Sequence, residues 1–290
     1  MLQFSDFIAG ILTTPAEPNS HRYLIVDAAA TRPTNLAQEL RLGHSGIDIL
    51  TGADCVWKDS ASPILVELPA GASSESVRRI ASEALRKWRY ANCFVFLETT
   101  YAPRDAAAML CERTQAVLPD EMEVVLRFFD PRVFSALVRH LNADALNSFL
   151  SGATRWAIPG RRGELQMIER KPSKSVASFV APLRLSSAEE AAMIDAGEAD
   201  AMVDLLLNQN NAQLLTMIPP EQYESVSSAL AQAHGFAIEQ TPDQAMFCAI
   251  ALALGLDFQT QEPWDKLLQE VKAGRVKFSE AAQLAQGASV

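Results

Sequence analysis

Short apolar runs alternate with helical patterns over the first 170 residues of the chain. Four runs are almost continuously apolar and are bounded by turn or cap residues: Tyr23–Ala28, Ile64–Leu68, Cys93–Leu97 and Val124–Phe129. Such runs are typical of strands that are covered on both faces. The intervening stretch Ser74–Trp88 repeats apolar residues at helical spacing. The pattern therefore predicts an α/β domain with a central sheet covered by helices.

One strand-to-helix junction is marked by its residue types. Asp130 is an N-cap residue, and Pro131 occupies the first helical position, where a missing amide hydrogen costs nothing. Apolar residues then recur at i, i+3, i+4 and i+7. Further on, residues 156–158 and 165–168 flank a glycine-rich turn and predict a hairpin.

The pattern changes after residue 170. The stretch Lys171–Leu185 contains prolines and serines without a sustained period, and we read it as a linker. The rest predicts helices at about 187–207, 220–235, 242–254, 264–271 and 278–284. Ser187 and Glu190 have the spacing of a capping box. We therefore expect an α/β domain over residues 1–170, a linker over 171–185 and an all-α domain over 186–290.

The helix expected over 242–254 is apolar almost all round. A helix of that kind is normally enclosed by its neighbours. We therefore expect it to be the buried centre of the all-α domain.

Negative charge is concentrated in the second part of the chain. The whole chain carries a net charge of -10, and the residues from Lys171 onward hold 7 Lys or Arg against 15 Asp or Glu. A surface of this sign repels phosphate backbones and anionic lipid headgroups, so we expect neither nucleic acid nor a membrane as a partner. The longest apolar run is about half of the roughly 20 residues that span a bilayer, and the N-terminus lacks a secretory pattern. We expect a cytoplasmic protein.

Few residues form a pattern that indicates chemistry. The sequence Gly43-His44-Ser45-Gly46 lacks the last glycine of a nucleophile elbow, since Ile47 occupies that position. The four histidines and four cysteines have no metal-ligand spacing, and no glycine-rich phosphate loop follows a strand. We expect no cofactor, no metal and no catalytic residues. Glu67 and Glu98, at predicted strand ends, are the carboxylates an α/β active site could recruit.

The charged junction around Asp130 has two readings. Arg127 and Arg132 place two guanidinium groups near one carboxylate. They could form a buried bidentate network, or a binding spot for an anionic group of a partner. We favour the structural network and keep the binding spot as the alternative.

The segment Arg127-Phe128-Phe129-Asp130-Pro131-Arg132-Val133 resembles the most recognisable motif of the effector adaptor, or chaperone, family of bacterial type VI secretion. The flanking runs at 23–29, 64–68 and 94–97 resemble the strands of that family's domain, and Trp156 resembles the tryptophan that closes it. The resemblance covers about residues 22–158. Phe129 stands where tyrosine is common, so a role for a hydroxyl group at that position is not expected.

The resemblance implies a non-enzymatic protein that binds a toxic effector in the cytoplasm and loads it onto a VgrG-type spike protein. Arg127, Asp130, Pro131, Arg132 and Trp156 are then structural motif residues or possible contacts with a partner. The alternative is a small, hydrolase-like α/β enzyme whose active site is dispersed along the sequence.

The acidic all-α domain is the part that we expect to bind the effector. Its charge suits a partner with basic and apolar groups, because opposite charges steer the encounter while apolar contacts supply most of the affinity. The residues expected to steer the effector are Glu189, Glu190, Asp195 and Glu198.

Overall fold

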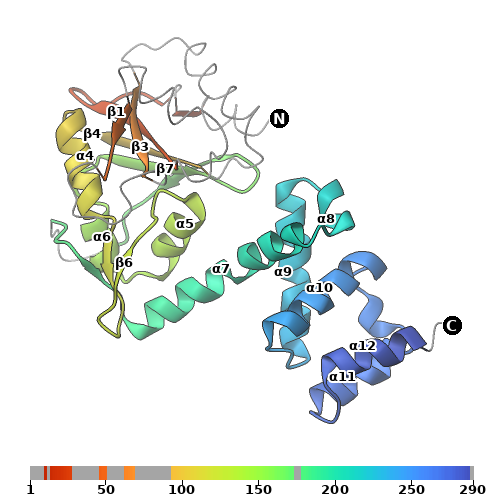
Figure 1. The fold of residues 1–290 in the computed structure, drawn as a ribbon. Coiled ribbons are helices and arrows are strands. Elements are labelled where there is room, and N and C mark those ends of the chain that lie inside the picture. The colour runs from red at the N-terminus through yellow and green to blue at the C-terminus, as the bar shows by residue number, and fades with distance from the viewer. Residues whose placement is uncertain are drawn as a thin grey trace. The chain divides into compact units, whose positions relative to one another are not determined.

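A computed structural model describes residues 10–11, 14–27, 46–50, 62–68, 93–172 and 178–287. The chain forms two compact units, Met1–Ala196 and Gly197–Val290, and each is described by itself. The helix expected over 74–88 and the Gly43-His44-Ser45 turn lie outside the described residues. The predicted fold class is confirmed: a sheet with helices is followed by a helical part (Figure 1).

A six-stranded sheet forms the centre of the first unit, in the order β2-β3-β1-β4-β7-β8. All of its strand pairs are antiparallel. The strands are β1 (His21–Val26), β2 (Gly46–Asp48), β3 (Ile64–Leu68), β4 (Phe94–Thr99), β7 (Arg155–Pro159) and β8 (Leu165–Ile168). The predicted hairpin is confirmed, because β7 and β8 pair with Pro159 opposite Leu165.

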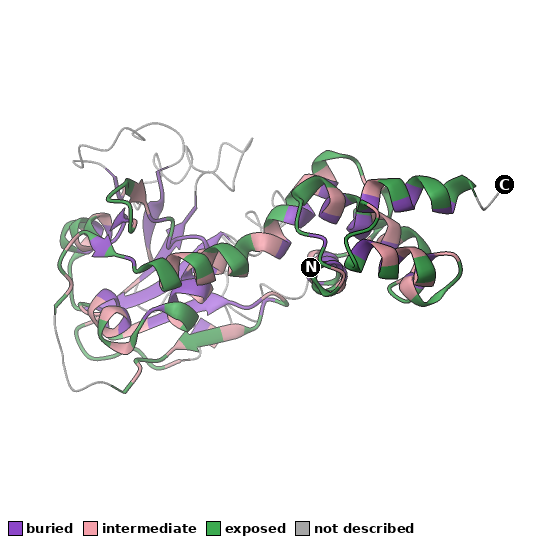
Figure 2. Ribbon diagram, turned by 90° about the horizontal axis from the view of Figure 1, so that it is seen from below, coloured by how far each residue is buried: buried purple, intermediate pink, exposed green. Residues whose placement is uncertain are grey.

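Both faces of this sheet are buried, as the continuous apolar runs predicted. Ile25 and Leu97 point into a core shared with α4 (Pro103–Glu112), α5 (Pro131–His140) and α6 (Ala143–Phe149). Leu24 and Phe96, which alternate with them, are buried as well, at 2% and 3% exposure. Strand residues alternate between the two faces of a sheet, so both faces are covered. The strands β1, β3, β4 and β7 are buried over most of their length, whereas the edge strands β2 and β8 are not, and Figure 2 shows buried residues in purple along the central strands.

A second sheet contains β5 (Gln115–Val117), β6 (Glu123–Val125) and β9 (Leu183–Arg184), in the order β6-β5-β9. The run 124–129 was expected to be one strand of the central sheet, and this is wrong. Its first residues belong to β6, and the chain then turns at Arg127, whose carbonyl accepts a hydrogen bond from the Asp130 amide at 2.9 Å. This turn places Phe128 and Phe129 in the core, which explains why both positions are apolar although neither belongs to a strand.

The stretch read as a linker is packed against the first unit at its end. Leu183 and Leu185 are buried in the core of that unit, and β9 pairs in parallel with β5. Leucines that alternate with polar residues are typical of a strand with one buried face. Residues 173–177 lie outside the described residues, and the expected domain limits stay a prediction.

The second unit contains helices in the described residues. They follow α7 (Ser187–Asn208), which begins in the first unit, and are α8 (Ala212–Thr216), α9 (Pro219–Gly235), α10 (Thr241–Leu254), the short 3-10 helix η1 (Phe258–Thr260), α11 (Trp264–Lys272) and α12 (Phe278–Gly287). Phe247 lies at the centre of an aromatic core, with ring centroids 5.1 Å from Phe258 and 5.5 Å from Phe278. Among the described residues, no helix combines the length and apolar character that crossing a bilayer requires.

Two helical details differ from expectation. The capping box of α7 lies one residue earlier than expected, because Ser186 and Glu189 exchange hydrogen bonds between side chain and backbone. The helix α10 is not enclosed by its neighbours. It buries one face, which includes Phe247 and Ala251, whereas Met246 and Leu254 on the other face are 39% and 54% exposed.

Candidate functional site

Three charged residues form a row across the middle of the large sheet. In the strand register, Arg22 of β1 lies opposite Glu98 of β4, and Glu98 lies opposite Arg155 of β7. The Glu98 side chain is fully buried, whereas the two arginines are 15% and 25% exposed. A buried carboxylate is stable only when it is paired and hydrogen-bonded, so its contacts indicate its role.

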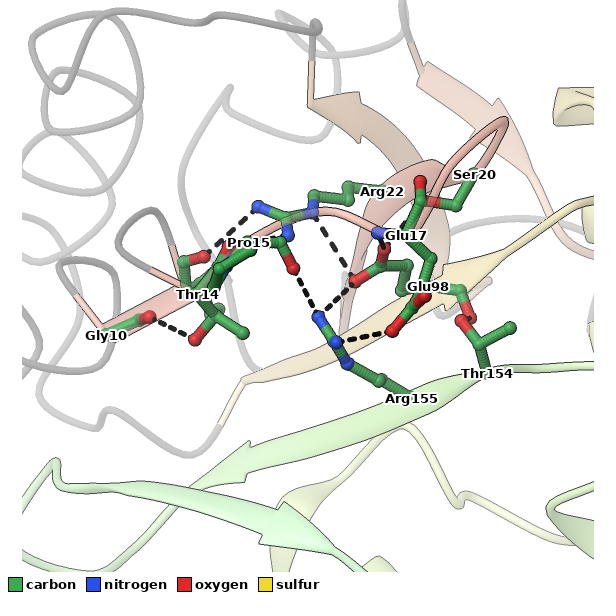
Figure 3. A network of polar contacts seen from close by, with 10 residues as sticks. Gly10, Thr14, Pro15, Glu17, Ser20, Arg22, Glu98, Thr154 and Arg155 are labelled. Carbon is green, nitrogen blue, oxygen red and sulfur yellow. Dashed lines mark hydrogen bonds and ion pairs between the residues drawn. The ribbon is translucent and has the colours of Figure 1, made fainter.

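Every described contact of the Glu98 carboxylate is with a donor (Figure 3). Its Oε1 accepts hydrogen bonds from the Glu17 amide and the Ser20 hydroxyl, each at 2.6 Å. Its Oε2 accepts a hydrogen bond from Arg155 Nη1 at 3.3 Å and lies 3.5 Å from Arg22 Nε. The carboxylate therefore joins the segment before β1 to three neighbouring strands.

The two arginines extend this network to the chain before β1. Arg155 donates to the carbonyl of Pro15 at 2.5 Å and to Glu17 Oε1 at 2.6 Å. Arg22 donates to the carbonyl of Thr14 at 2.7 Å. The network, which we call the Glu98 network, fixes residues 14–20 against the sheet. Glu98 therefore has a structural role. The second strand-end carboxylate, Glu67, is partly exposed, and its Oε1 lies 2.8 Å from His21 Nδ1.

Asp130 caps α5, as predicted. Its Oδ1 accepts a hydrogen bond from the Arg132 amide at 2.9 Å, and Pro131 occupies the first helical position. The Arg132 guanidinium folds back onto the same carboxylate, with Nη2 at 2.8 Å from Oδ2. The prediction that Asp130 both caps the helix and engages a neighbouring guanidinium is therefore confirmed.

The second arginine of the motif has a different carboxylate. Arg127 Nη2 donates to Asp27 Oδ2 at 2.7 Å, and its guanidinium lies 5.6 Å from the centre of the Phe129 ring. Asp27 is buried, whereas the Arg127 side chain is 49% exposed. The two guanidinium groups thus engage two carboxylates rather than one. Both arginines keep part of their surface accessible to a partner, so the binding-spot reading stays open.

The aromatic residues of the motif join its helix to the sheet. Phe128 contacts Phe149 and Trp156 edge to face, with centroids 5.5 and 6.2 Å apart, and Phe134 lies 5.3 Å from Trp156. The Trp156 indole donates a hydrogen bond to the carbonyl of Leu150 at 3.1 Å. Such pairs add stability beyond the burial of their area. Trp156, which the sequence placed at the end of the motif domain, therefore lies in its core.

A buried arginine holds the loop between α6 and β7. Arg113 is 2% exposed and donates to the carbonyls of Met109, Phe149 and Ser151 at 2.6 to 2.7 Å. Its guanidinium also lies over the ring of Phe179, 4.7 Å from the centre. Burial lowers the pKa of Arg113 to about 10, so the group remains charged at neutral pH.

The acidic residues expected to steer an effector lie on α7. Glu189 accepts hydrogen bonds from the backbone and side chain of both Ser186 and Asn142. Burial raises the pKa of Glu189, but these hydrogen bonds together outweigh it, so its pKa lies below the ordinary value. Asp195 is exposed and Glu190 is partly exposed.

The fourth of these residues, Glu198, belongs to the second unit. It contacts His234 Nε2 at 3.0 Å and accepts a hydrogen bond from the buried amide of Gln244 at 3.2 Å. Glu189 and Glu198 therefore have structural contacts, while Asp195 presents its charge to solvent. A steering role for the four stays a prediction.

Thiols and metal-ligating side chains are two further kinds of group, among the described residues, that could carry chemistry. Cys93, Cys111 and Cys248 are not in disulfides. Burial raises the pKa of Cys248 to about 12, which suppresses the reactive thiolate. No three His, Cys, Asp or Glu side chains of the described ranges are placed to hold a metal ion.

One family model matches the region that contains the Asp130 motif. Residues 22–148 match the family model described as Domain of unknown function (DUF4123). This domain family is associated with effector adaptors of type VI secretion. The match contains β1, β3, β4 and the Asp130 motif, but it ends before β7. No curated protein and no solved structure matches the chain.

The sequence reasoning missed the Glu98 network and the exposed face of α10. Arg22 and Arg155 each lie directly before the apolar run of their strand, so both were left outside the expected strands. A charged residue at the corresponding end of three strands is a signal that could have found the network. No local signal shows which face of an almost entirely apolar helix lacks a partner.

Proposed function

We propose that this chain is a non-enzymatic adaptor that binds a type VI secretion effector in the bacterial cytoplasm and loads it onto a VgrG-type spike protein. The observation that carries the proposal is the match of residues 22–148 to a domain family associated with such adaptors. Neither partner is changed covalently in this role.

Two features of the described residues support a binding role. The arginines of the Asp130 motif are paired with Asp27 and Asp130, and about half of the Arg127 side chain is still exposed. The second unit combines a net negative charge with large apolar side chains at its surface, among them Leu215, Ile218 and Leu254. Large apolar side chains exposed to solvent are the kind of surface that interaction sites use.

The proposal is tested in a bacterium that carries the system. The tagged full-length chain is purified from the native cell, and the proteins bound to it are identified by mass spectrometry. We expect one toxic effector together with a spike protein. Deleting the gene should stop secretion of that effector while other effectors of the same system are still secreted.

Two results would contradict the proposal. One is a purification that contains neither an effector nor a spike protein. The other is secretion of the bound effector at the normal level in the deletion strain. Intact mass spectrometry of the bound effector provides a further check, because an adaptor should leave the mass of its partner unchanged.

A further inference from the structure

The helix α10 presents an apolar stripe to solvent. From Met246 to the end of the helix, every exposed or half-buried position is apolar: Met246, Ala249, Ile250, Leu252, Ala253 and Leu254. The helix packs against α8, α9 and α12, and Figure 1 shows α9 beside it. The buried residues of α10 include Phe247, Cys248 and Ala251. Most helices of a globular protein place polar residues on the side that faces water. This stripe therefore lacks the polar residues expected of a solvent-facing surface.

The stripe has the geometry of a helix-binding ridge. Met246, Ile250 and Leu254 follow one another at intervals of four residues, which is the row that packs into the groove of a second helix. The two large side chains at its ends are 39% and 54% exposed. Leu256, just beyond the helix, adds a further side chain that is 38% exposed.

The charge of the residues around the stripe indicates which kind of partner could bind there. Asp243 lies near the start of α10, and Asp257 follows its end. The chain contains no Lys or Arg between Arg184 and Lys266, and residues 197–290 carry 4 Lys or Arg against 12 Asp or Glu. Two of these four cations, Lys266 and Arg275, are paired with Glu262 and Glu270. A second copy of this chain would bring two surfaces of the same sign together, which is unfavourable.

We propose that the α10 stripe binds a basic amphipathic helix, whose apolar ridge packs on Met246, Ile250 and Leu254 while flanking Lys or Arg residues face the acidic surface. The proposal rests on the proposed function, since it takes this helix to be a segment of the effector. Apolar contacts would supply most of the affinity, and the opposite charges would speed the encounter and exclude acidic segments.

The first test uses a defined probe and the full chain. The probe is a fluorescent synthetic helix of leucine and lysine, about 18 residues or five turns long, with leucine at i, i+3, i+4 and i+7. Binding is measured by fluorescence anisotropy. A peptide of the same composition in scrambled order keeps the charge but lacks the ridge, and a leucine–glutamate peptide keeps the ridge but reverses the charge. We expect binding of the first peptide alone.

Three variants separate binding at the stripe from general attraction between opposite charges. Leu254→Asp should weaken binding about tenfold or more, although it adds a negative charge, because it removes an apolar anchor. Met246→Glu should act in the same direction. Leu284→Asp changes a side chain of similar exposure, 58%, on α12 and should leave binding unchanged. Because all three side chains are exposed, the melting temperature should change little.

Three outcomes would overturn the proposal. The first is unchanged or tighter binding by Leu254→Asp, which would show attraction by charge alone. The second is a dimer of the purified chain that Leu254→Asp dissociates, seen by light scattering, which would make the stripe a contact between copies.

The third outcome concerns the native cell. If Leu254→Asp still retains the effector at the normal level, the stripe is not its binding site, and the adaptor function stands. If the unaltered chain captures no effector, the proposed adaptor function is wrong, and so is the proposal that the bound helix belongs to an effector. The anisotropy measurement would still show whether the α10 stripe binds a basic amphipathic helix.

Discussion

The Glu98 network can be broken by removing a single charge. In Glu98→Gln the side chain keeps its shape, but one carboxylate oxygen becomes an amide NH₂ group. Every described neighbour of the two oxygens is a donor: the Glu17 amide, the Ser20 hydroxyl, Arg22 and Arg155. Either orientation of the amide therefore places NH₂ against a donor, and both arginines lose their shared buried anion.

The expected loss follows from the burial of the three groups. Removing one partner of a buried ion pair typically costs about 3 to 5 kcal/mol. The arginines are 15% and 25% exposed and keep other partners, so we expect a smaller loss, about 2 to 4 kcal/mol. For a unit of this size, that corresponds to a melting temperature lower by roughly 4 to 16 °C.

Calorimetry of the full chain measures the shift, and hydrogen exchange locates it. Peptides from β1, β4 and β7 should lose protection in Glu98→Gln, whereas those from α9 and α10 should not. The matched control is Glu67→Gln, which removes a half-exposed carboxylate from the neighbouring strand β3 and should change stability by less than about 0.5 kcal/mol. Equal melting temperatures for the two variants would refute the structural role of the Glu98 network.

Three further outcomes are expected. Asp130→Ala should lower the stability by about 1 to 2 kcal/mol in urea unfolding, and Asp130→Asn should recover most of it, because asparagine also caps helices; equal losses would contradict the cap. Cys248, with its pKa raised to about 12, should resist iodoacetamide at pH 8 in the native chain and react in denaturant, as seen by mass spectrometry; rapid native labelling would contradict its burial. The pKa of Glu189 is lowered on folding, so the stability from its contacts is present above the unfolded pKa of about 4.3 and is lost as pH falls through the folded value; Glu189→Gln should flatten the acid limb of the stability curve, and an unchanged limb would contradict this.

Local residue types predicted the elements that carry strong start and stop signals. The Asp130-Pro131 pair located α5, and the apolar run 64–68 coincides with β3. The cap of α7 was placed one residue late, because Ser186-Ser187 and Glu189-Glu190 offer the same spacing in two registers. Only the folded backbone distinguishes the two registers.

Features that depend on tertiary contacts could not be predicted in the same way. The run 124–129 has the composition of a strand, yet Phe128 and Phe129 owe their apolar character to an aromatic core that they enter from a turn. The Glu98 network requires the register of three strands, which the sequence does not specify. The apolar pattern of α10 predicted burial on every side, and which face is covered is decided by the packing of α8, α9 and α12, which the sequence of α10 does not specify.

The parallel pairing of β9 with β5 has a consequence for how such genes can diversify. The matched family region ends at residue 148, but the core of the first unit is completed by Trp156 and by Leu183. A recombination crossover at the end of the matched region would separate these residues from the strands that they complete. Because Met193 of α7 also packs against this core, crossovers that preserve the unit lie beyond Ala196. The tail after that point is therefore the part that can be exchanged without removing residues from the core of the first unit.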